Sequence, residues 1–249
     1  MIVKTDQEEQ PFLSVTAPVF NEQDNIEEVL IYWNEVLDDL DLSSEIVLTN
    51  DGSTDDTRQI LARLRAAMPR LVVVTHERNH GYGKALTDSI QHSRGQWVVT
   101  IDSDGQFDLK DCIPLLHMAL SDSLDGVTGY RTKKKDTLFR VFADRVLNWI
   151  VRLFFGVNYR DTNCALKVIK GDFLRQINIE ARGYPAPTEV CIKLTRLGAK
   201  LGEEGVSHAE RAGGLSKLRP FQTSVNFLKF LTYLKFKIFL YNQKVIHSL

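Results

Sequence analysis

Two aspartates stand close together where a buried strand is expected to end. Asp102 and Asp104 directly follow the apolar run 97–101. Carboxylates this close repel one another unless a cation or hydrogen-bond donors gather them. Oxygen ligands of this kind suit a hard divalent cation such as Mg²⁺ or Mn²⁺. The spacing therefore leaves two interpretations, a solvated turn and a metal site. A third aspartate, Asp108, has a simpler explanation, because it can cap a helix that begins near Lys110.

The elements that must position these carboxylates alternate along the chain. Apolar runs predict strands over 12–19, 45–49, 71–75, 97–101 and 126–129, and amphipathic spacing predicts helices over 24–40, 54–68, 83–93 and 110–120. Alternation of this kind is typical of βαβ units and of a mainly parallel sheet covered by helices. We therefore predict an α/β fold.

Polar clusters follow each of the five predicted strands. They lie at 18–22, 50–53, 79–84, 102–104 and 130–131. Any one of them alone is best explained as a turn or a helix cap. In an open α/β sheet, however, ligands bind beyond the carboxyl ends of the strands. Five clusters at one edge of the sheet therefore favour a binding site.

Composition excludes several classes of protein. The chain has 249 residues, of which 43% are hydrophobic and 25% are charged, and its net charge of −1 argues against a general nucleic-acid binder. Three scattered cysteines fit neither a zinc site nor a disulfide framework, and no secretory signal is visible, so a reducing cytoplasm is expected. A dinucleotide-binding fingerprint and a phosphate-binding P-loop are both missing from the sequence.

Seven short motifs together resemble the family 2 glycosyltransferases of GT-A fold, and in particular the dolichol-phosphate mannosyltransferases and the bacterial polyprenyl-phosphate glycosyltransferases. The motifs are APVFNEQDNI (17–26), NDGSTDDT (50–57), NHGYGKAL (79–86), DSDGQ (102–106), GYR (129–131), RDTNCALKV (160–168) and HAERAGGLSKL (208–218). Their order and spacing are specific, whereas any single motif would be a weak signal. Asn50 departs from the Asp-Asp pair that is common in the family, and one carboxylate is thereby lost.

The resemblance implies a role for each matching residue. Asp104 would be the direct metal ligand, and Asp102 would contact the nucleotide or metal-bound water. Asp51 would contact the base or ribose of the donor. Residues implied to bind the nucleotide sugar are Pro18, Phe20, Glu22, Asp51, Asp102, Ser103, Gln106, Arg131, Arg211 and Lys217.

The acceptor depends on whether the site holds a general base. A hydroxyl acceptor must lose a proton, and Glu189 stands where the family places a base, although its usual partner carboxylate is absent. A phosphate acceptor is already an anion and needs cations rather than a base. By resemblance to the family, Arg145 is the strongest candidate for binding the acceptor phosphate. The cations available for this purpose are Arg131, Arg140, Arg145, Arg211 and Lys217, and the catalytic candidates are Asp104, Arg131, Arg145 and Glu189.

The segment 221–241 has the length of a transmembrane helix. Its three lysines would each cost about 2.5–3.5 kcal/mol at the centre of a bilayer, which argues against a span. We instead predict an amphipathic helix at a membrane interface, with the basic, aromatic segment 138–155 as a second one. Packing on the core or a homodimer contact is the alternative. These predictions divide the chain into a catalytic domain, 1–220, and a C-terminal helix, 221–249.

The resemblance and the missing base partner together predict an inverting, metal-dependent transferase. It would move a sugar from GDP-mannose or a UDP-hexose to a polyprenyl or dolichyl phosphate. It would act at the cytoplasmic face of the membrane, bound peripherally to anionic lipid or through a membrane-anchor protein. Two alternatives stay open: transfer to a hydroxyl with Glu189 as base, and a non-catalytic scaffold that binds nucleotide sugars.

Overall fold

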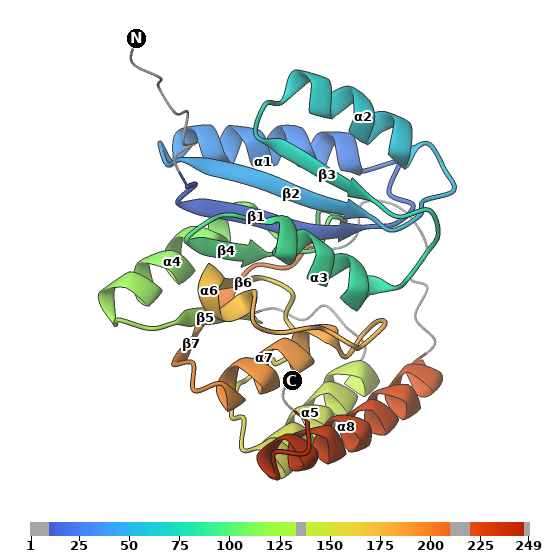
Figure 1. Ribbon diagram of the computed structural model, residues 1–249, viewed down its shortest axis with the longest axis vertical. Helices are drawn as coiled ribbons and strands as arrows, with labels where there is room; N and C mark the ends of the chain where they lie inside the picture. Colours follow the sequence, from blue (N-terminus) through green and yellow to red (C-terminus); the bar gives the residue numbers. More distant parts are fainter. Residues whose placement is uncertain (1–9, 133–137, 210–219, 247–249) are drawn as a thin grey trace.

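A seven-stranded sheet forms the centre of the computed structural model, which describes residues 10–132, 138–209 and 220–246, without the side chains of 138–144 and 220–224 (Figure 1). The strand order is β3-β2-β1-β4-β6-β5-β7. The strands are β1 (Leu13–Val19), β2 (Ser44–Asn50), β3 (Leu71–Thr75), β4 (Trp97–Thr100), β5 (Gly126–Arg131), β6 (Lys167–Lys170) and β7 (Leu201–Val206).

Strand β6 alone among these seven runs against its neighbours. It pairs antiparallel with both β4 and β5, whereas the pairs β1–β2, β2–β3, β1–β4 and β5–β7 are parallel. The carboxyl ends of the parallel strands meet at one edge of the sheet. Because β6 is reversed, the residues that precede it arrive at that same edge.

Helices cover both faces of the sheet (Figure 1). They are α1 (Ile26–Asp39), α2 (Thr57–Ala67), α3 (Tyr82–His92), α4 (Cys112–Ser121) after a 3₁₀ turn η1 (Leu109–Asp111), α5 (Leu138–Phe155), α6 (Gly171–Leu174), α7 (Ala186–Arg196) and α8 (Pro220–Asn242). The α/β prediction is confirmed, and the five predicted strands and four predicted helices all form, with ends shifted by a few residues. Strands β6 and β7 were not predicted, because β6, KVIK, has only two apolar residues between its lysines and β7, LGEEGV, carries polar residues and glycines.

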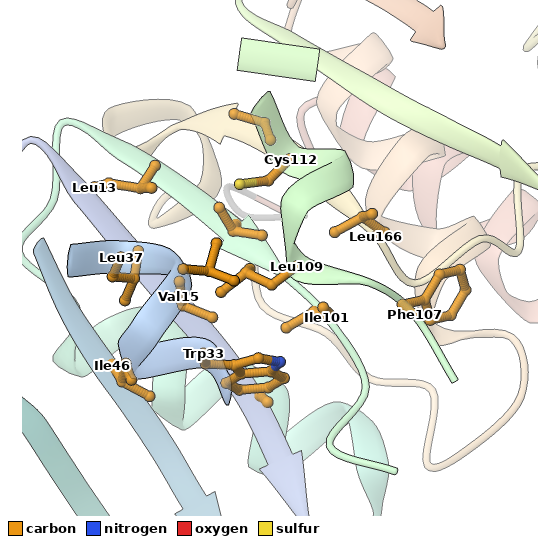
Figure 2. Packing of buried hydrophobic residues seen from close by; sticks show 14 of the residues in the cluster. Leu13, Val15, Trp33, Leu37, Ile46, Ile101, Phe107, Leu109, Cys112 and Leu166 are labelled. Atoms are coloured by element: carbon orange, nitrogen blue, oxygen red, sulfur yellow. The ribbon is translucent and has the colours of Figure 1, made fainter. Parts of the chain in front are cut away.

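Successive residues of β4 separate the core into two layers. Val99 packs with α1 and α4 in one cluster, part of which Figure 2 shows around Trp33. Val98 packs with α3 and α7 in the other cluster. Burying a side chain of this kind contributes about 1.5–3 kcal/mol, so the strand is fixed from both sides. The predicted apolar stripe of α1, which includes Trp33, is buried throughout.

Helix α8 has apolar residues on two faces. Phe227, Leu231, Leu234 and Ile238 form a buried cluster with α5 and α7, and the two long helices lie side by side (Figure 1). Its outer face exposes Leu228, Tyr233, Phe236 and Phe239. The helix is therefore less amphipathic than predicted. The division at residue 220 stays a prediction. Over the described residues, no helix combines the length and the apolar composition needed to cross a membrane.

Candidate active site

The two aspartates of the DSD motif lie at the carboxyl end of β4. Tyr82, the first residue of α3, donates a hydrogen bond from its phenol to Oδ1 of Asp102 at 2.7 Å. Between the aspartates, the Ser103 hydroxyl donates to the carbonyl of Pro18 at 2.8 Å, which joins the ends of β4 and β1. Oδ1 of Asp104 accepts from the backbone N–H of Gln106 at 3.1 Å. The motif is thus held by the sheet, by α3 and by its own turn.

The pKa of the Asp102 carboxyl group lies close to neutral pH. Burial and the charge of Asp104 raise its pKa to about 7, although the Tyr82 hydrogen bond and the charges of Arg131 and Lys167 act in the opposite direction. Burial and the neighbouring Asp102 raise the pKa of the Tyr82 phenol well above its usual value, so Tyr82 stays a donor. A divalent cation would relieve the repulsion between the two carboxylates, and their oxygens are ligands that Mg²⁺ and Mn²⁺ accept.

Two carboxylates alone make an incomplete cation site. No group of three or more histidine, cysteine, aspartate or glutamate side chains in the described part of the chain could hold a metal ion. Mg²⁺ in such sites commonly takes one or two carboxylates and completes its shell with water and substrate phosphates. The pair fits a cation that arrives with a phosphate-bearing ligand.

Asp51, directly after β2, is held in place by the loop that leads to α3. Its carboxylate accepts backbone N–H bonds from His80 at 2.9 Å and from Gly81 at 2.8 Å, and it contacts Nδ1 of His76 at 2.7 Å. The other ring nitrogen of His76 lies 2.8 Å from Asp88. A carboxylate offers about four lone-pair sites, so most of those on Asp51 face the protein itself. Its predicted contact with the donor base stays a prediction.

Asn50, next to Asp51, is buried and only half satisfied. Its side-chain oxygen accepts from the N–H of Ser53, whereas its NH₂ group finds no hydrogen-bond partner in the described structure. Phe20 and Glu22 are half-buried on the segment between β1 and α1, and the backbone N–H of Glu22 donates to the Thr57 hydroxyl. The predicted nucleotide-pocket residues at the carboxyl ends of β1 and β2 therefore lie at the same edge of the sheet as Asp102.

Arg131 forms a paired unit with Asp161, which lies in the motif RDTNCALKV (160–168) but was not among the predicted site residues. The guanidinium of Arg131 contacts both carboxylate oxygens, Nε to Oδ2 at 2.7 Å and Nη2 to Oδ1 at 3.1 Å. Burial opposes the charged guanidinium, but the hydrogen bonds and charge of Asp161 outweigh it and raise the pKa of Arg131 further. Arg131 is thus a fixed cation at the end of β5. Since β6 is antiparallel, Asp161 reaches the site from the segment before its strand.

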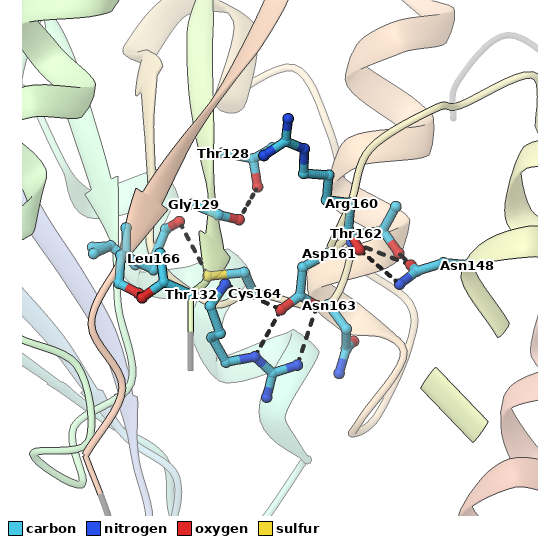
Figure 3. Close-up of polar contacts among 12 residues, drawn as sticks. Thr128, Gly129, Thr132, Asn148, Arg160, Asp161, Thr162, Asn163, Cys164 and Leu166 are labelled. Carbon is cyan, nitrogen blue, oxygen red and sulfur yellow. Dashed lines mark hydrogen bonds and ion pairs between the residues drawn. The ribbon is translucent and has the colours of Figure 1, made fainter. Parts of the chain in front are cut away.

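Helix α5 holds the segment that carries Asp161 (Figure 3). The side-chain oxygen of Asn148 accepts from the hydroxyl and the N–H of Thr162, at 2.8 and 3.3 Å, and its NH₂ group donates to the carbonyl of Arg160. Arg145 is exposed on α5, one helical turn before Asn148. The structure therefore places the predicted acceptor cation on the helix that binds the Asp161 segment.

Gln106 holds another chain segment beside the DSD motif. Its carbonyl accepts from the N–H of Ala209 at 2.8 Å, and its side-chain NH₂ donates back to the Ala209 carbonyl at 3.1 Å. Next to this pair, the rings of Phe107 and His208 meet edge to face. The predicted residues Arg140, Arg211 and Lys217 lie outside the residues whose side chains the structure describes.

Glu189 is fully buried on α7 and is engaged by the protein itself. Its carboxylate lies 2.7 Å from the ammonium of Lys193, which is also fully buried. It accepts further hydrogen bonds from the N–H groups of Glu180 and Ala181, at 3.0 and 2.8 Å. A general base must reach the proton that it removes. These contacts suit an anchor for the 180–181 backbone and leave Glu189 poorly placed to act as a base.

A family model described as "Glycosyl transferase family 2" matches residues 14–175. Undecaprenyl-phosphate 4-deoxy-4-formamido-L-arabinose transferase of Edwardsiella ictaluri (strain 93-146) is 32% identical over 208 residues, which cover 83% of this chain and 62% of that protein. Dodecaprenyl-phosphate galacturonate synthase of Rhizobium johnstonii is 28% identical over 236 residues, which cover 90% of this chain and 68% of that protein. The chain thus spans only part of the length of these curated relatives.

Solved structures share the fold. Glucosyl-3-phosphoglycerate synthase from Mycobacterium tuberculosis in complex with phosphoglyceric acid superposes with a TM-score of 0.66 at 22% identity, covering 88% of this chain and 78% of that one. The same synthase in complex with Mn²⁺ and uridine-diphosphate-glucose gives 0.65 at 21% identity, with 90% and 78% covered. Together with the strand order, these similarities confirm the predicted GT-A fold.

Proposed function

This chain belongs to glycosyl transferase family 2, and we propose that it transfers a sugar from a nucleotide-diphospho-sugar to a polyprenyl phosphate with inversion at the anomeric carbon. The two relatives described above, named for undecaprenyl-phosphate and dodecaprenyl-phosphate sugar chemistry, support the acceptor class. GDP-mannose and UDP-hexoses are the donors that we propose to test.

The donor end of the proposed site is the DSD motif. Asp102 and Asp104 would hold Mg²⁺ or Mn²⁺ together with the donor diphosphate. The structure of the same fold in complex with Mn²⁺ and uridine-diphosphate-glucose supports a divalent cation as part of donor binding. A cation there offsets the negative charge that builds up on the leaving nucleoside diphosphate. Ser103 keeps the motif fixed to Pro18 of β1, so the carboxylates need little reorganisation when the donor binds.

The contacts of Glu189 are the main observation in favour of a phosphate acceptor over a hydroxyl acceptor. Because its carboxylate is buried against Lys193 and two backbone N–H groups, it is poorly placed to deprotonate a hydroxyl. A phosphate oxygen is already a nucleophilic anion. It would attack the anomeric carbon and form a new C–O bond as the bond to the donor diphosphate breaks. Such an attack needs cations that orient the phosphate, the role that we propose for Arg145, Arg211 and Lys217.

Arg131 has a different part in this proposal. Both carboxylate oxygens of Asp161 accept hydrogen bonds from the guanidinium of Arg131, and this bidentate pair fixes its orientation. The charge of Arg131 already acts on Asp102, the donor carboxylate. We therefore assign Arg131 to the donor side, where a fixed positive charge lowers the repulsion between the acidic pair and an incoming phosphate.

The outer surfaces of α5 and α8 support binding at a membrane surface. Trp149 and Leu153 of α5 and Phe236 of α8 are 62%, 64% and 60% exposed. Basic side chains on the same two helices, Arg152 and Lys229, are exposed as well. Aromatic and aliphatic side chains with interspersed cations are typical of helices that lie in the interface of an anionic bilayer. We propose that this surface, at the cytoplasmic face, brings the site to its lipid acceptor.

The test compares two acceptors that differ only in the phosphate. The purified chain is incubated with labelled GDP-mannose or UDP-glucose, Mn²⁺ and either a polyprenyl phosphate or the corresponding free polyprenol, and lipid-bound label is measured. We expect label on the phosphate and at least 100-fold less on the alcohol. Equal labelling of the alcohol would contradict the phosphate acceptor, and labelling of neither lipid with any nucleotide sugar would contradict the proposed reaction.

A further inference from the structure

We propose that Tyr82 is a positioning residue, which fixes the carboxylate of Asp102 in the orientation that binds the cation and the donor diphosphate. This inference rests on the proposed function, because it concerns the same pair of aspartates. Tyr82 comes from the sequence motif NHGYG, but the motif does not indicate what its phenol contacts.

The contact itself is short and directional. The phenol oxygen of Tyr82 lies 2.7 Å from Oδ1 of Asp102. Asp102 and Asp104 repel one another, so a free carboxylate at position 102 would gain by turning away from its neighbour. A hydrogen bond on Oδ1 opposes that rotation and leaves the other oxygen, Oδ2, with a fixed direction.

Tyr82 can act in this way only if its own backbone is fixed, and the neighbouring loop supplies this. The N–H of Tyr82 donates to the carbonyl of Arg182 at 2.9 Å. A Cβ added to Gly81 would lie 2.7 Å from that same carbonyl oxygen, and one added to Gly83 would collide with the carbonyl oxygen of Ala181. The two glycines therefore allow the start of α3 to press directly against the backbone at 181–182.

Glu189 holds the loop from its other side. The buried carboxylate accepts from the N–H groups of Glu180 and Ala181, and Lys193 balances its charge. A continuous set of contacts thus leads from α7 through the 180–182 backbone to Tyr82 and Asp102. A residue that orients a ligand in this way typically contributes 10- to 100-fold to metal affinity.

A second tyrosine–aspartate pair in the same region offers a matched control. The phenol of Tyr32 lies 2.6 Å from Oδ1 of Asp108, and Asp108 caps the turn at Lys110 as the sequence predicted. Tyr32→Phe removes the same kind of hydrogen bond, with the same change of one oxygen atom. It touches a carboxylate that has no part in the proposed cation site.

The experiment measures Mn²⁺ binding directly. Free Mn²⁺ is followed by electron paramagnetic resonance during titration of the wild type, Tyr82→Phe and Tyr32→Phe, each with GDP and with UDP present. We expect Tyr82→Phe to bind Mn²⁺ at least tenfold more weakly, with nucleotide binding restored by excess Mn²⁺, while Tyr32→Phe stays within twofold of the wild type. Circular dichroism and thermal unfolding establish that each variant is folded.

Three failing outcomes can be told apart. If the wild type binds Mn²⁺ with a nucleotide and Tyr82→Phe binds it equally well, the positioning role is refuted and the proposed function stands. If Tyr82→Phe lowers nucleotide binding to an extent that excess Mn²⁺ does not restore, the phenol acts on something other than the cation site, and the inference fails too. If the wild type shows no nucleotide-dependent Mn²⁺ binding, the proposed function falls and this inference falls with it.

Discussion

The variant Glu189→Gln can show whether Glu189 is a structural anchor or a general base, because the two roles predict different effects on stability and activity. Glu189 and Lys193 are both fully buried, and their charged groups lie 2.7 Å apart. In the Glu189→Gln variant the Lys193 ammonium keeps its hydrogen bond to the carbonyl of Asn178 at 2.6 Å but loses its closest counter-charge. Breaking one side of a buried ion pair costs about 3–5 kcal/mol. We therefore expect a strong loss of stability.

The loss can be converted into a melting temperature. For chains of 150–250 residues each kcal/mol shifts the midpoint by about 2–4 °C, so Glu189→Gln should melt roughly 6–20 °C lower. Lys193 still lies 3.6 Å from the Glu180 carboxylate in Glu189→Gln, but it has lost its closest partner. The double variant Glu189→Gln/Lys193→Met removes this weakly paired charge and should regain at least half of the loss. An exposed pair provides the control: Glu27 and Arg63 are 45% and 63% exposed, so Glu27→Gln should change stability by less than about 1 kcal/mol.

The assay combines thermal unfolding with sugar transfer. If Glu189 is an anchor, the double variant should recover at least half of the lost melting temperature and a measurable fraction of its activity. A general base contributes about 10²–10⁴-fold to the rate, and this contribution could not return when Lys193 is changed. A Glu189→Gln variant that melts like the wild type but has lost its activity, with no recovery in the double variant, would refute the anchor role of Glu189.

Three further predictions follow from other parts of the site. Asp161→Asn should lower kcat/KM for the donor at least tenfold, mainly by raising the donor KM, because Arg131 loses its fixed orientation beside the incoming donor phosphate. Steady-state kinetics against the conservative variant Asp161→Glu checks this. Burial and the charge of Asp104 raise the pKa of Asp102 to about 7, above its ordinary value of 3.8. Without a cation, the folded protein therefore binds a proton that the unfolded chain releases, so stability should fall as pH rises from about 4 to about 7 and then level off. Asp102→Asn should flatten this profile in pH-dependent thermal unfolding, and in the wild type Mn²⁺ binding should weaken below pH 7. Trp149→Ser should reduce flotation with anionic vesicles at least threefold while leaving the melting temperature within about 2 °C, because this side chain is exposed.

The last two predictions have clear contrary outcomes. A stability profile that rises from pH 4 to pH 7 in the wild type, or an Asp102→Asn profile of unchanged slope, would show that Asp102 does not titrate as described. If Trp149→Ser does not change flotation, α5 does not take part in membrane binding. A concentration-dependent dimer that forms without vesicles and is lost in the same variant would instead assign this surface to a contact between two copies of the chain.

Sequence patterns predicted the elements whose apolar residues repeat clearly. The stripe of α1 and the runs of β1 to β5 belong to this class, and the DSD motif was located because a polar cluster followed a buried strand. The search for polar residues directly after strands did not find Asp161, because Asp161 lies before β6. The rule considers residues after strands, and a four-residue antiparallel strand brings the residues before it to the site instead.

Other features depend on contacts that spacing only partly signals. Lys193 lies four residues after Glu189, and this helical spacing could have indicated an ion pair in place of a base. Tyr82 lay within a motif selected from the sequence, but its contact with Asp102 joins residues twenty positions apart across two elements. This contact depends on how α3 packs on the sheet, and the local pattern of apolar residues does not predict such tertiary packing.

The reversed strand β6 also has a consequence for how the fold can change. Strands β5 and β6 are direct antiparallel neighbours, a pair that a turn of two residues could join, yet residues 132–166 lie between them. Because pairing fixes both ends of this connection, its length and content can vary while the sheet and the DSD motif keep their places. The connection carries α5 with Arg145, one of the cations proposed to meet the acceptor, so this part of the acceptor side can change in sequence and length while the DSD motif on β4 stays in place.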